Sequence, residues 1–151
     1  KWLGKEHPDT ATTYNNIALV YHNQGDYAKA LEWNYKALAV REKWLSKEHT
    51  DTATTYNNIA CVYRSQKDYA KALEWYDKAL AIYEKVLGAE HPNTATTYNN
   101  IALVYHNQGD YANALEWYYK ALAIYEKVLG AEHPNTATTY SNIAMAYQHQ
   151  R

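Results

Sequence analysis

The sequence repeats itself every 42 residues, and this period constrains the fold more than any other feature. Residues 7–48 and 91–132 are identical at 34 of 42 positions, and residues 49–90 match 91–132 equally well. Such close copies indicate repeated structural units. The sequence therefore predicts a single repeat array over residues 1–151, in which residues 1–6 are the tail of a preceding unit. The predicted units are three full repeats and a partial fourth with a first helix only: 7–48, 49–90, 91–132 and 133–151.

Each repeat carries the pattern of two helices. In the first repeat, small and aromatic side chains recur at helical spacing along one stripe: Ala11, Tyr14, Ile17, Ala18 and Tyr21. A second helical pattern runs from about Tyr27 to Leu45. No segment alternates strictly between apolar and polar residues, as a half-buried strand would. The chain is therefore predicted to be all-α, with seven helices in antiparallel pairs.

Helix start and stop signals stand at the same places in the repeats. His7 and Pro8 mark the start of the first helix, because proline is favoured in the first turn of a helix. Gly25 follows that helix, where glycine adopts the left-handed conformation at low cost. The second repeat has Lys67 at this place, and a left-handed lysine costs on the order of 1 kcal/mol.

Composition argues against several classes of partner. The 15 Lys+Arg and 16 Asp+Glu residues nearly balance, whereas nucleic acids and anionic membranes attract clustered positive charge. No apolar run approaches the roughly 18 residues of a membrane span. Cys61 is the single cysteine, so no internal disulfide forms, which fits a cytoplasmic protein. The chain is expected to bind neither nucleic acid nor membrane.

The residue pattern resembles the tetratricopeptide repeat, in the 42-residue variety similar to that of kinesin light chains. The match rests on residues 14–21, then Gly25 to Tyr27, then Ala30, Ala37 and Leu38, where large, small and aromatic positions alternate as in the family. Where the family usually has a helix-ending proline, this chain has Glu42, Glu84 and Glu126. The resemblance implies an α-solenoid with a right-handed superhelix, whose first helices line the concave side.

A ladder of polar side chains is predicted to face that concave side. On a helical wheel these residues lie opposite the Tyr14 and Tyr21 stripe. Asparagine amides donate and accept hydrogen bonds as a peptide backbone does, and similar ladders in the family hold peptide backbones. The alternative is that each asparagine bonds only a neighbouring helix or turn. The predicted peptide-binding residues are Thr12, Asn16, Leu19, Asn23, Thr54, Asn58, Thr96, Asn100, Leu103, Asn107 and Asn142.

The predicted groove lacks the Lys and Arg clamp with which some family members hold a C-terminal carboxylate. The corresponding positions are Asn15, Leu19, Thr96 and Asn100. No strong preference for a free carboxylate or an acidic peptide is therefore expected. The function predicted from the sequence is a non-catalytic scaffold that binds an extended peptide or partner segment.

Metal, cofactor and catalytic sites are not expected. The four histidines at the repeat period lie in successive turns about 10 Å apart, too far to converge on one zinc ion; they are predicted to be turn residues or helix caps. Cys61 has no neighbouring general base in the sequence, so the chain is not expected to be an enzyme. Trp33, Trp75 and Trp117 could stack bases, but packing between repeats is expected because no basic residues surround them.

Two positions in the first repeat break the pattern. Asn34 and Arg41 stand where the second and third repeats have tyrosines. Either this end of the array is partly exposed, or the pair forms a polar pocket facing the second repeat. Exposure is the expectation, since a buried unpaired arginine is costly.

The alternative function is self-association. The last helix has no second helix behind it, so Ile143, Ala144 and Tyr147 are expected to lack part of their cover. One chain's terminal helix could cover the exposed end of another, giving homo-oligomers through the array ends.

Overall fold

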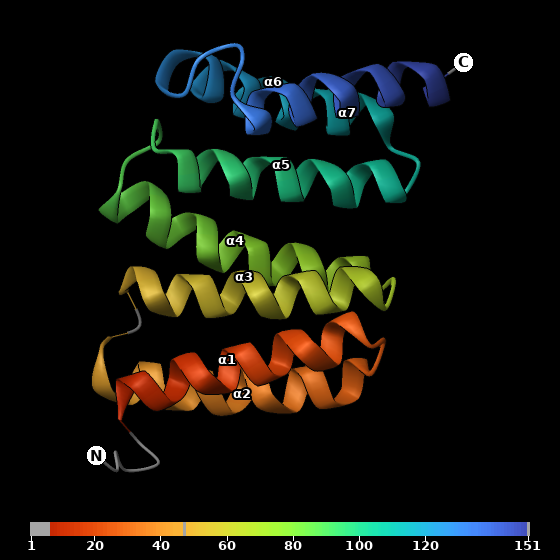
Figure 1. The fold of residues 1–151 in the computed structure, drawn as a ribbon. Helices are drawn as coiled ribbons and strands as arrows, with labels where there is room; N and C mark the ends of the chain where they lie inside the picture. Colours follow the sequence, from red (N-terminus) through yellow and green to blue (C-terminus); the bar gives the residue numbers. More distant parts are fainter. Residues whose placement is uncertain (1–6, 47, 151) are drawn as a thin grey trace. The chain divides into compact units, whose positions relative to one another are not determined.

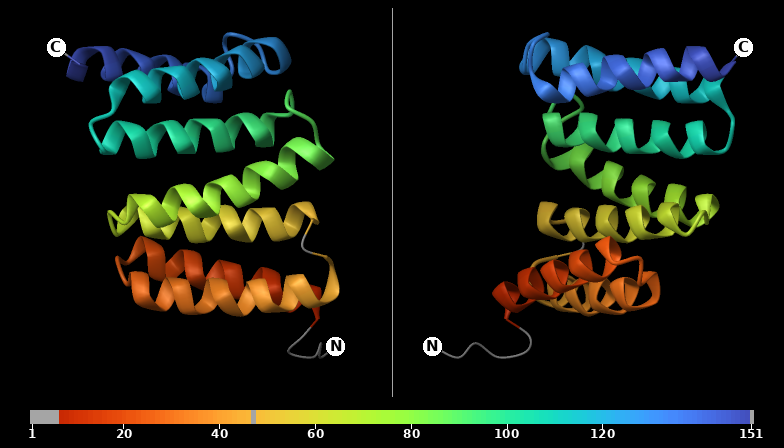
Figure 2. Two further views of the ribbon diagram at one scale, coloured as in Figure 1. Left: turned by 180° about the vertical axis from the view of Figure 1, so that it is seen from behind. Right: turned by 45° about the vertical axis from the view of Figure 1, so that its right-hand side comes forward.

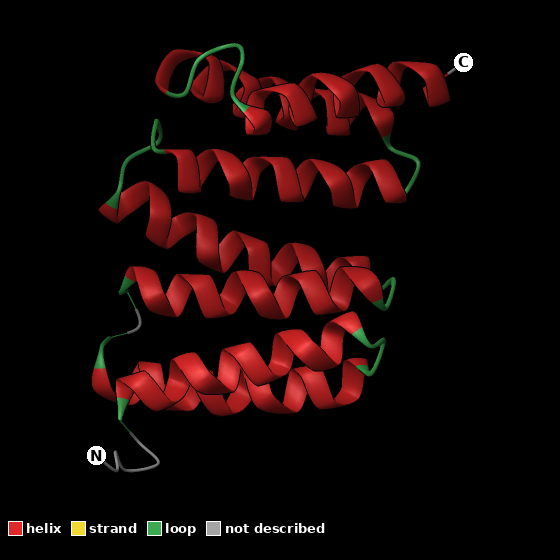
Figure 3. Ribbon diagram, viewed as in Figure 1, coloured by secondary structure: helices red, strands yellow, loops and turns green. Residues whose placement is uncertain are grey.

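The structure, a computed structural model, describes residues 7–46 and 48–150. These residues form seven α-helices and no strand (Figures 1 and 3), so the predicted all-α class with seven helices is confirmed. None of the described helices is both long and apolar enough to span a membrane. The predicted tail of a preceding unit, residues 1–6, lies outside the described residues. The helices are α1 (Pro8–Asn23), α2 (Tyr27–Trp44), α3 (Thr50–Ser65), α4 (Tyr69–Val86), α5 (Pro92–Asn107), α6 (Tyr111–Val128) and α7 (Pro134–Gln150).

The helices group into two compact units. Unit 1 ends at Ile82 and unit 2 begins at Tyr83, so the division falls within α4. In unit 1, α1 packs along α2, and α3 packs on α2 and contacts α1 (Figure 2). The small residues predicted at close helix approaches, Ala18, Ala30 and Ala37, are all buried. An alanine removes the side-chain bulk that would hold two helix axes apart, so these residues allow the antiparallel pair to close.

Unit 2 repeats this packing with α6 between α5 and α7. Both outer helices of the unit contact α6. One buried cluster draws on all three helices and is bordered by half-buried Leu103, Tyr105, Trp117 and Leu122. Its members are Ala102, Ala114, Leu115, Tyr118, Ile143 and Ala146. Each helix buries one apolar stripe against its neighbour, which is why a single repeat cannot form this core alone.

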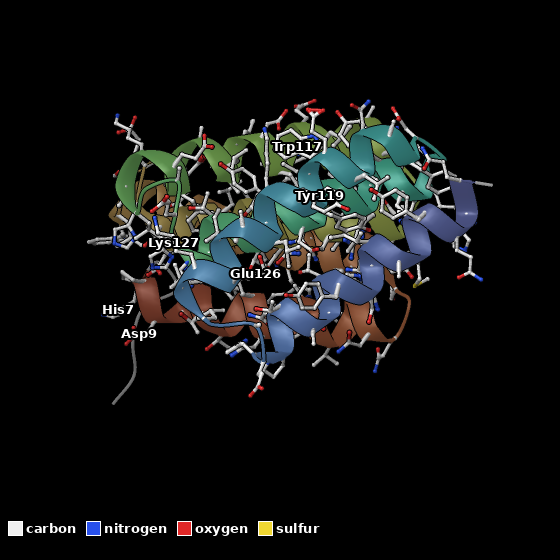
Figure 4. The ribbon with its side chains drawn as sticks, turned by 90° about the horizontal axis from the view of Figure 1, so that it is seen from above. His7, Asp9, Trp117, Tyr119, Glu126 and Lys127 are labelled. Atoms are coloured by element: carbon white, nitrogen blue, oxygen red, sulfur yellow. The ribbon has the colours of Figure 1, made fainter. Side chains whose placement is uncertain are left out.

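The repeated histidines cap helices, as predicted. The Nδ1 of His7, His49 and His91 each accepts a hydrogen bond from the backbone N–H two residues later, at 3.0 Å. His133 does the same for the N–H of Asn135 at 3.1 Å. Figure 4 shows His7 and Asp9 at the start of α1. The imidazole thereby satisfies one of the N–H groups that a helix N-terminus leaves without an intrahelical partner.

The turn within each repeat also follows the prediction. Gly25 and Gly109 have φ of 83° and 82°, and Lys67 adopts the same left-handed conformation with φ of 67°. The next residue closes the turn, since the N–H of Asp68 donates to the carbonyl of Tyr63 at 2.9 Å, as Asp26 does to Tyr21. The second repeat thus keeps the same turn geometry, although the side chain of Lys67 disfavours the left-handed conformation.

The glutamates that replace the family's proline tie each second helix to the next first helix. Tyr56 donates to Glu42 at 2.9 Å and Tyr98 donates to Glu84 at 2.6 Å. Tyr140 makes the same contact with Glu126. Burial first, and then the hydrogen bond to the carboxylate, raise the pKa of Tyr56 and of Tyr98 to about 12. A proline here would end the helix, whereas glutamate continues it and adds a hydrogen bond.

Candidate functional site

Unit 1 contains a pocket of about 280 Å³ lined by α1, α2 and α3. Four of the predicted peptide-binding residues line it: Asn16, Leu19, Asn23 and Asn58. Two residues of the predicted asparagine ladder, Asn16 on α1 and Asn58 on α3, therefore line the same pocket. The other lining residues are Asn15, Ala18, His22, Asn34, Cys61 and Arg64.

The remaining predicted residues of unit 1 are the threonines Thr12 and Thr54. Both are exposed, but the Thr12 hydroxyl accepts a hydrogen bond from Arg41 at 3.2 Å. The Thr54 hydroxyl donates to the carbonyl of Thr50, one helical turn earlier, at 3.1 Å. Neither lines the pocket. Both hydroxyls therefore already have hydrogen-bond partners within unit 1.

In unit 2, two of the predicted residues, Thr96 and Leu103, contact neighbouring residues. The Thr96 hydroxyl can donate a hydrogen bond to the carbonyl of Pro92. It also lies 2.6 Å from the Tyr125 hydroxyl, and either hydroxyl can be the donor in that hydrogen bond. Leu103 packs half-buried against the core cluster of this unit. Asn107 is exposed, whereas Asn100 and Asn142 are half-buried. Asn100 and Asn142 keep the ladder position, while Thr96 and Leu103 contribute to packing.

The expectation that Asn34 and Arg41 are exposed is wrong. Their exposed fractions are 2% and 7%. The Arg41 guanidinium donates to the Thr55 hydroxyl at 2.9 Å, the Asp51 carbonyl at 3.0 Å and the Thr12 hydroxyl at 3.2 Å. Acceptors from α1 and α3 thus hydrogen-bond the buried charge, which removes the reason for expecting exposure. Asn34 lines the pocket together with residues of the second repeat, whereas Arg41 is not among the lining residues, so the other alternative, a polar pocket formed by the pair, holds for Asn34 alone.

Several polar atoms at this pocket are buried without a hydrogen-bond partner in the described part of the chain. They are the Oδ1 atoms of Asn15 and Asn34 and the Nη1 atom of Arg64. The Asn15 amide nitrogen, by contrast, donates to the Thr55 hydroxyl at 3.3 Å. An unpaired buried acceptor beside an unpaired buried donor favours a ligand group that supplies both kinds of hydrogen bond.

His22 forms a polar wall of the pocket. Its Nε2 lies 2.8 Å from the Ser65 hydroxyl. Burial lowers the pKa of His22 below its ordinary 6.5, and the positive charge of Arg64 lowers it further. The imidazole is therefore neutral at pH 7, and it presents one donor and one acceptor nitrogen.

Six lining residues were not among the predicted peptide-binding residues, and Arg64 is the one that carries a charge. It stands where the first and third repeats have His22 and His106. It gives the pocket a positive charge, although Asn15 and Leu19, which also line the pocket, are uncharged where some family members carry Lys or Arg. Its departure from the repeat was a usable signal, because Cys61 and Ser65 in α3 also differ from their counterparts in the first and third repeats. Cys61 also lines the pocket, and its Sγ lies 3.0 Å from the Tyr76 hydroxyl.

The tryptophans pack mainly within their own repeats. Trp33 lies against Tyr14, and Trp117 against Tyr98, with ring centroids 5.4 and 5.6 Å apart. Trp75 also contacts Tyr35 of the first repeat at 6.0 Å, which is the predicted packing between repeats. A lysine ammonium covers each indole at 4.2–4.4 Å. Figure 4 shows Trp117 on α6, the helix that also carries Tyr119, Glu126 and Lys127.

Comparison with known proteins defines the class of this chain. The sequence profile of the tetratricopeptide repeat matches residues 9–85, 51–107 and 93–151. No curated protein matches the sequence. The chain belongs to the tetratricopeptide repeat family. This membership supports a role as a protein-interaction scaffold, and the family is typically non-catalytic.

Solved structures place it more narrowly within that family. It is similar to BtubC (BKLC) from P. vanneervenii, with 25% identity and a TM-score of 0.84 over 95% of this chain and 57% of that one. It is also similar to a Podosopora anserina putative kinesin light chain with nearly identical repeats, with 27% identity and a TM-score of 0.84 over 95% of this chain and 68% of that one. The predicted similarity to kinesin light chains and the α-solenoid class are confirmed. The chain spans little more than half the length of BtubC.

A more distant match supports the fold alone. The N-terminal domain of stress-induced protein-1 from C. elegans has 19% identity and a TM-score of 0.64, over 91% of this chain and 96% of that one. The helical arrangement therefore persists where most residues differ.

Proposed function

We propose that the chain binds an extended peptide or partner segment along its first helices, without catalysing a reaction. The observation that carries this proposal is the pocket of unit 1, where Asn16 on α1 and Asn58 on α3 line one concave site. Their amides offer the paired donor and acceptor that a peptide group requires. Leu19, 56% exposed beside them, offers apolar surface to a side chain of the segment.

In unit 2, Asn100 and Asn142 occupy the equivalent ladder positions on α5 and α7. Asn107 on α5 adds an exposed polar group in unit 2, and Thr54 on α3 adds one in unit 1. The near balance of acidic and basic residues fits a segment recognised by hydrogen bonds and shape, not by net charge. A protein partner in the cytoplasm fits this proposal.

The test uses the whole chain and an arrayed library of random peptides. Asn16→Ala with Asn58→Ala should weaken the best peptides about tenfold or more, because each truncation leaves a peptide group unpaired. The melting temperature should change little, since Asn16 is exposed and Asn58 is half-buried. Asn113→Ala is the matched control, because Asn113 is exposed on α6. Equal loss in the control, or no peptide bound by the parent chain, would contradict the proposal.

A second candidate function is end-to-end assembly of copies. Val20 on α1 is 56% exposed, although its counterpart Val62 in α3 is 1% exposed, and Met145 and Tyr147 on α7 are 46% and 49% exposed. A neighbouring copy would give these residues the cover that the repeat supplies to Val62. Light scattering over a wide concentration range tests this: assembly raises the mass with concentration, and a constant monomer mass rejects it. Val20→Lys should abolish any such growth.

A further inference from the structure

Asn34 occupies a position built for a tyrosine. Its counterparts in the second and third repeats, Tyr76 and Tyr118, are both 0% exposed. Asn34 is almost as deeply buried, with an exposed fraction of 2%, but its side chain is much shorter. In unit 1 the pocket of about 280 Å³ lies against this asparagine. The first repeat therefore lacks a phenol ring at a place where the fold buries one elsewhere.

The groups around a missing ring indicate what would replace it. The Tyr118 hydroxyl lies 3.4 Å from Nδ1 of His106, twelve residues before it. His22 stands twelve residues before Asn34 and lines the pocket. Because its Nε2 faces Ser65, its Nδ1 is the ring nitrogen available to an occupant of the pocket. The partner that holds a tyrosine hydroxyl in the third repeat is thus also present in the first.

The unpaired buried atoms select the same chemistry. A phenol hydroxyl donates one hydrogen bond and accepts others, so it can pair with both the Oδ1 of Asn34 and the Nη1 of Arg64. A carboxylate would pair with Arg64 but would face the Oδ1 atoms of Asn15 and Asn34, which are both acceptors. Ala18 and Leu19 supply aliphatic contact for the ring. The volume is ample, since a cavity of roughly 150 Å³ accepts benzene.

We propose that the pocket formed by Ala18, Leu19, His22, Asn34 and Arg64 binds a 4-hydroxyphenyl ring. The ring belongs either to a free small phenol or to a tyrosine side chain of a bound segment. The second source rests on the proposed peptide-binding function, whereas the first is independent of it. The proposed ligand would occupy the space that a tyrosine of the chain itself fills in the second and third repeats.

The first experiment titrates the full chain with p-cresol, the tyrosine side chain as a free molecule. Saturable binding is expected, with NMR shifts at Ala18, Leu19 and His22. Toluene, which lacks the hydroxyl, should bind about tenfold more weakly, because Asn34 and Arg64 then stay unpaired. Equal affinity for p-cresol and toluene, or no saturable binding of p-cresol, would overturn the proposal.

Asn34→Tyr provides the decisive variant. Tyrosine is the native residue at this position in two repeats, so the variant is expected to fold and to fill its own pocket. It should lose p-cresol binding and melt at a higher temperature. Asn113→Tyr, at an exposed site of α6, is the matched control and should bind p-cresol as the parent does. Retention of p-cresol binding by a folded Asn34→Tyr chain would refute the assignment.

A peptide pair distinguishes the two sources of the ring. Peptides from the library are compared with Tyr→Phe versions of the same sequence. A preference for tyrosine that disappears in Asn34→Tyr assigns the pocket to a bound segment, and p-cresol binding without that preference assigns it to a free phenol. If peptides bind through Asn16 and Asn58 but p-cresol does not bind, the proposed function stands and the phenol pocket fails.

Discussion

Units 1 and 2 place the same two helix positions in their interiors and fill them with opposite chemistry. In unit 2, α6 buries Tyr118 and Tyr125, with exposed fractions of 0% and 3%. In unit 1, α2 buries Asn34 and Arg41 at the equivalent sites, with 2% and 7%. The position on the helix therefore decides burial, and the residue type decides only how the buried space is satisfied.

The second of these positions keeps even its partner. Tyr125 lies 2.6 Å from the Thr96 hydroxyl, and Arg41 donates to Thr12, the counterpart of Thr96, at 3.2 Å. The arginine adds bonds to Asp51 and Thr55 on α3. The first position differs more, because tyrosine fills its space and asparagine leaves a pocket. The same two buried positions can therefore hold either tyrosines, as in unit 2, or polar residues, as in unit 1, without a change of fold.

The largest expected effect comes from truncating the packed version. Tyr118→Ala should lower the free energy of unfolding by about 3–5 kcal/mol, because a large buried ring is replaced by a cavity. Asn34→Ala should cost less than about 1 kcal/mol, since it removes a buried oxygen that has no partner. Urea unfolding followed by circular dichroism measures both. Equal costs at the two sites would contradict the contrast between the units.

The polar version is tested at Arg41. Arg41→Ala should destabilise the chain by about 2–4 kcal/mol, because it leaves a cavity and removes the buried hydrogen bonds to Asp51 and Thr55. Arg41→Tyr restores the residue of the other repeats and should be neutral or stabilising, by up to about 2 kcal/mol. The same unfolding measurement applies. A tyrosine variant as unstable as the alanine variant would show that unit 1 requires the guanidinium.

A smaller difference lies in the turns. Lys67→Gly should raise the free energy of unfolding by about 0.5–1 kcal/mol, because glycine adopts positive φ without strain. Gly109→Ala should lower it by about 1 kcal/mol for the same reason. Thermal melting of both variants beside the parent measures the effect. A change of the same sign in both would show that backbone conformation does not control this turn.

The smallest effect concerns pH. Burial, and then the charge of Arg64, lower the pKa of His22; burial, and then His149, lower that of His106. A lowered pKa means that the unfolded state binds protons more readily, so stability is present above 6.5 and is lost as pH falls through 6.5 toward the folded values. His22→Gln with His106→Gln should flatten this fall, since Gln148 is native at that place in the fourth repeat. Melting temperatures between pH 8 and pH 5 are the measurement, and an unchanged slope would contradict the assignment.

Most of the fold was predictable because its signals are local and recur. The helix limits follow from His7 with Pro8 and from Gly25, and the close helix contacts follow from buried alanines such as Ala18 and Ala37. Repetition strengthened each signal, since a pattern seen three times is hard to mistake. The prediction of seven helices depended on nothing more.

The candidate site was predictable only in part. Helical geometry placed Asn16, Leu19, Asn23 and Asn58 on one surface, and the structure brings them to one pocket. Arg64 was missed as a lining residue, and Asn34 was expected to be exposed. Both errors concern residues whose surroundings come from other helices, which no periodicity within one helix describes.

The amino-acid sequence by itself determined the repeat, its helices, their caps and their tight contacts, because each depends on residues within one or two turns of one another. The tertiary structure decided that Asn34 and Arg41 are buried and that a pocket opens beside Asn34. That outcome needed acceptors from α1 and α3 to meet a guanidinium from α2. Whether a buried charge is tolerated depends on which hydrogen-bonding groups the packed helices bring to it, and packing alone sets that arrangement.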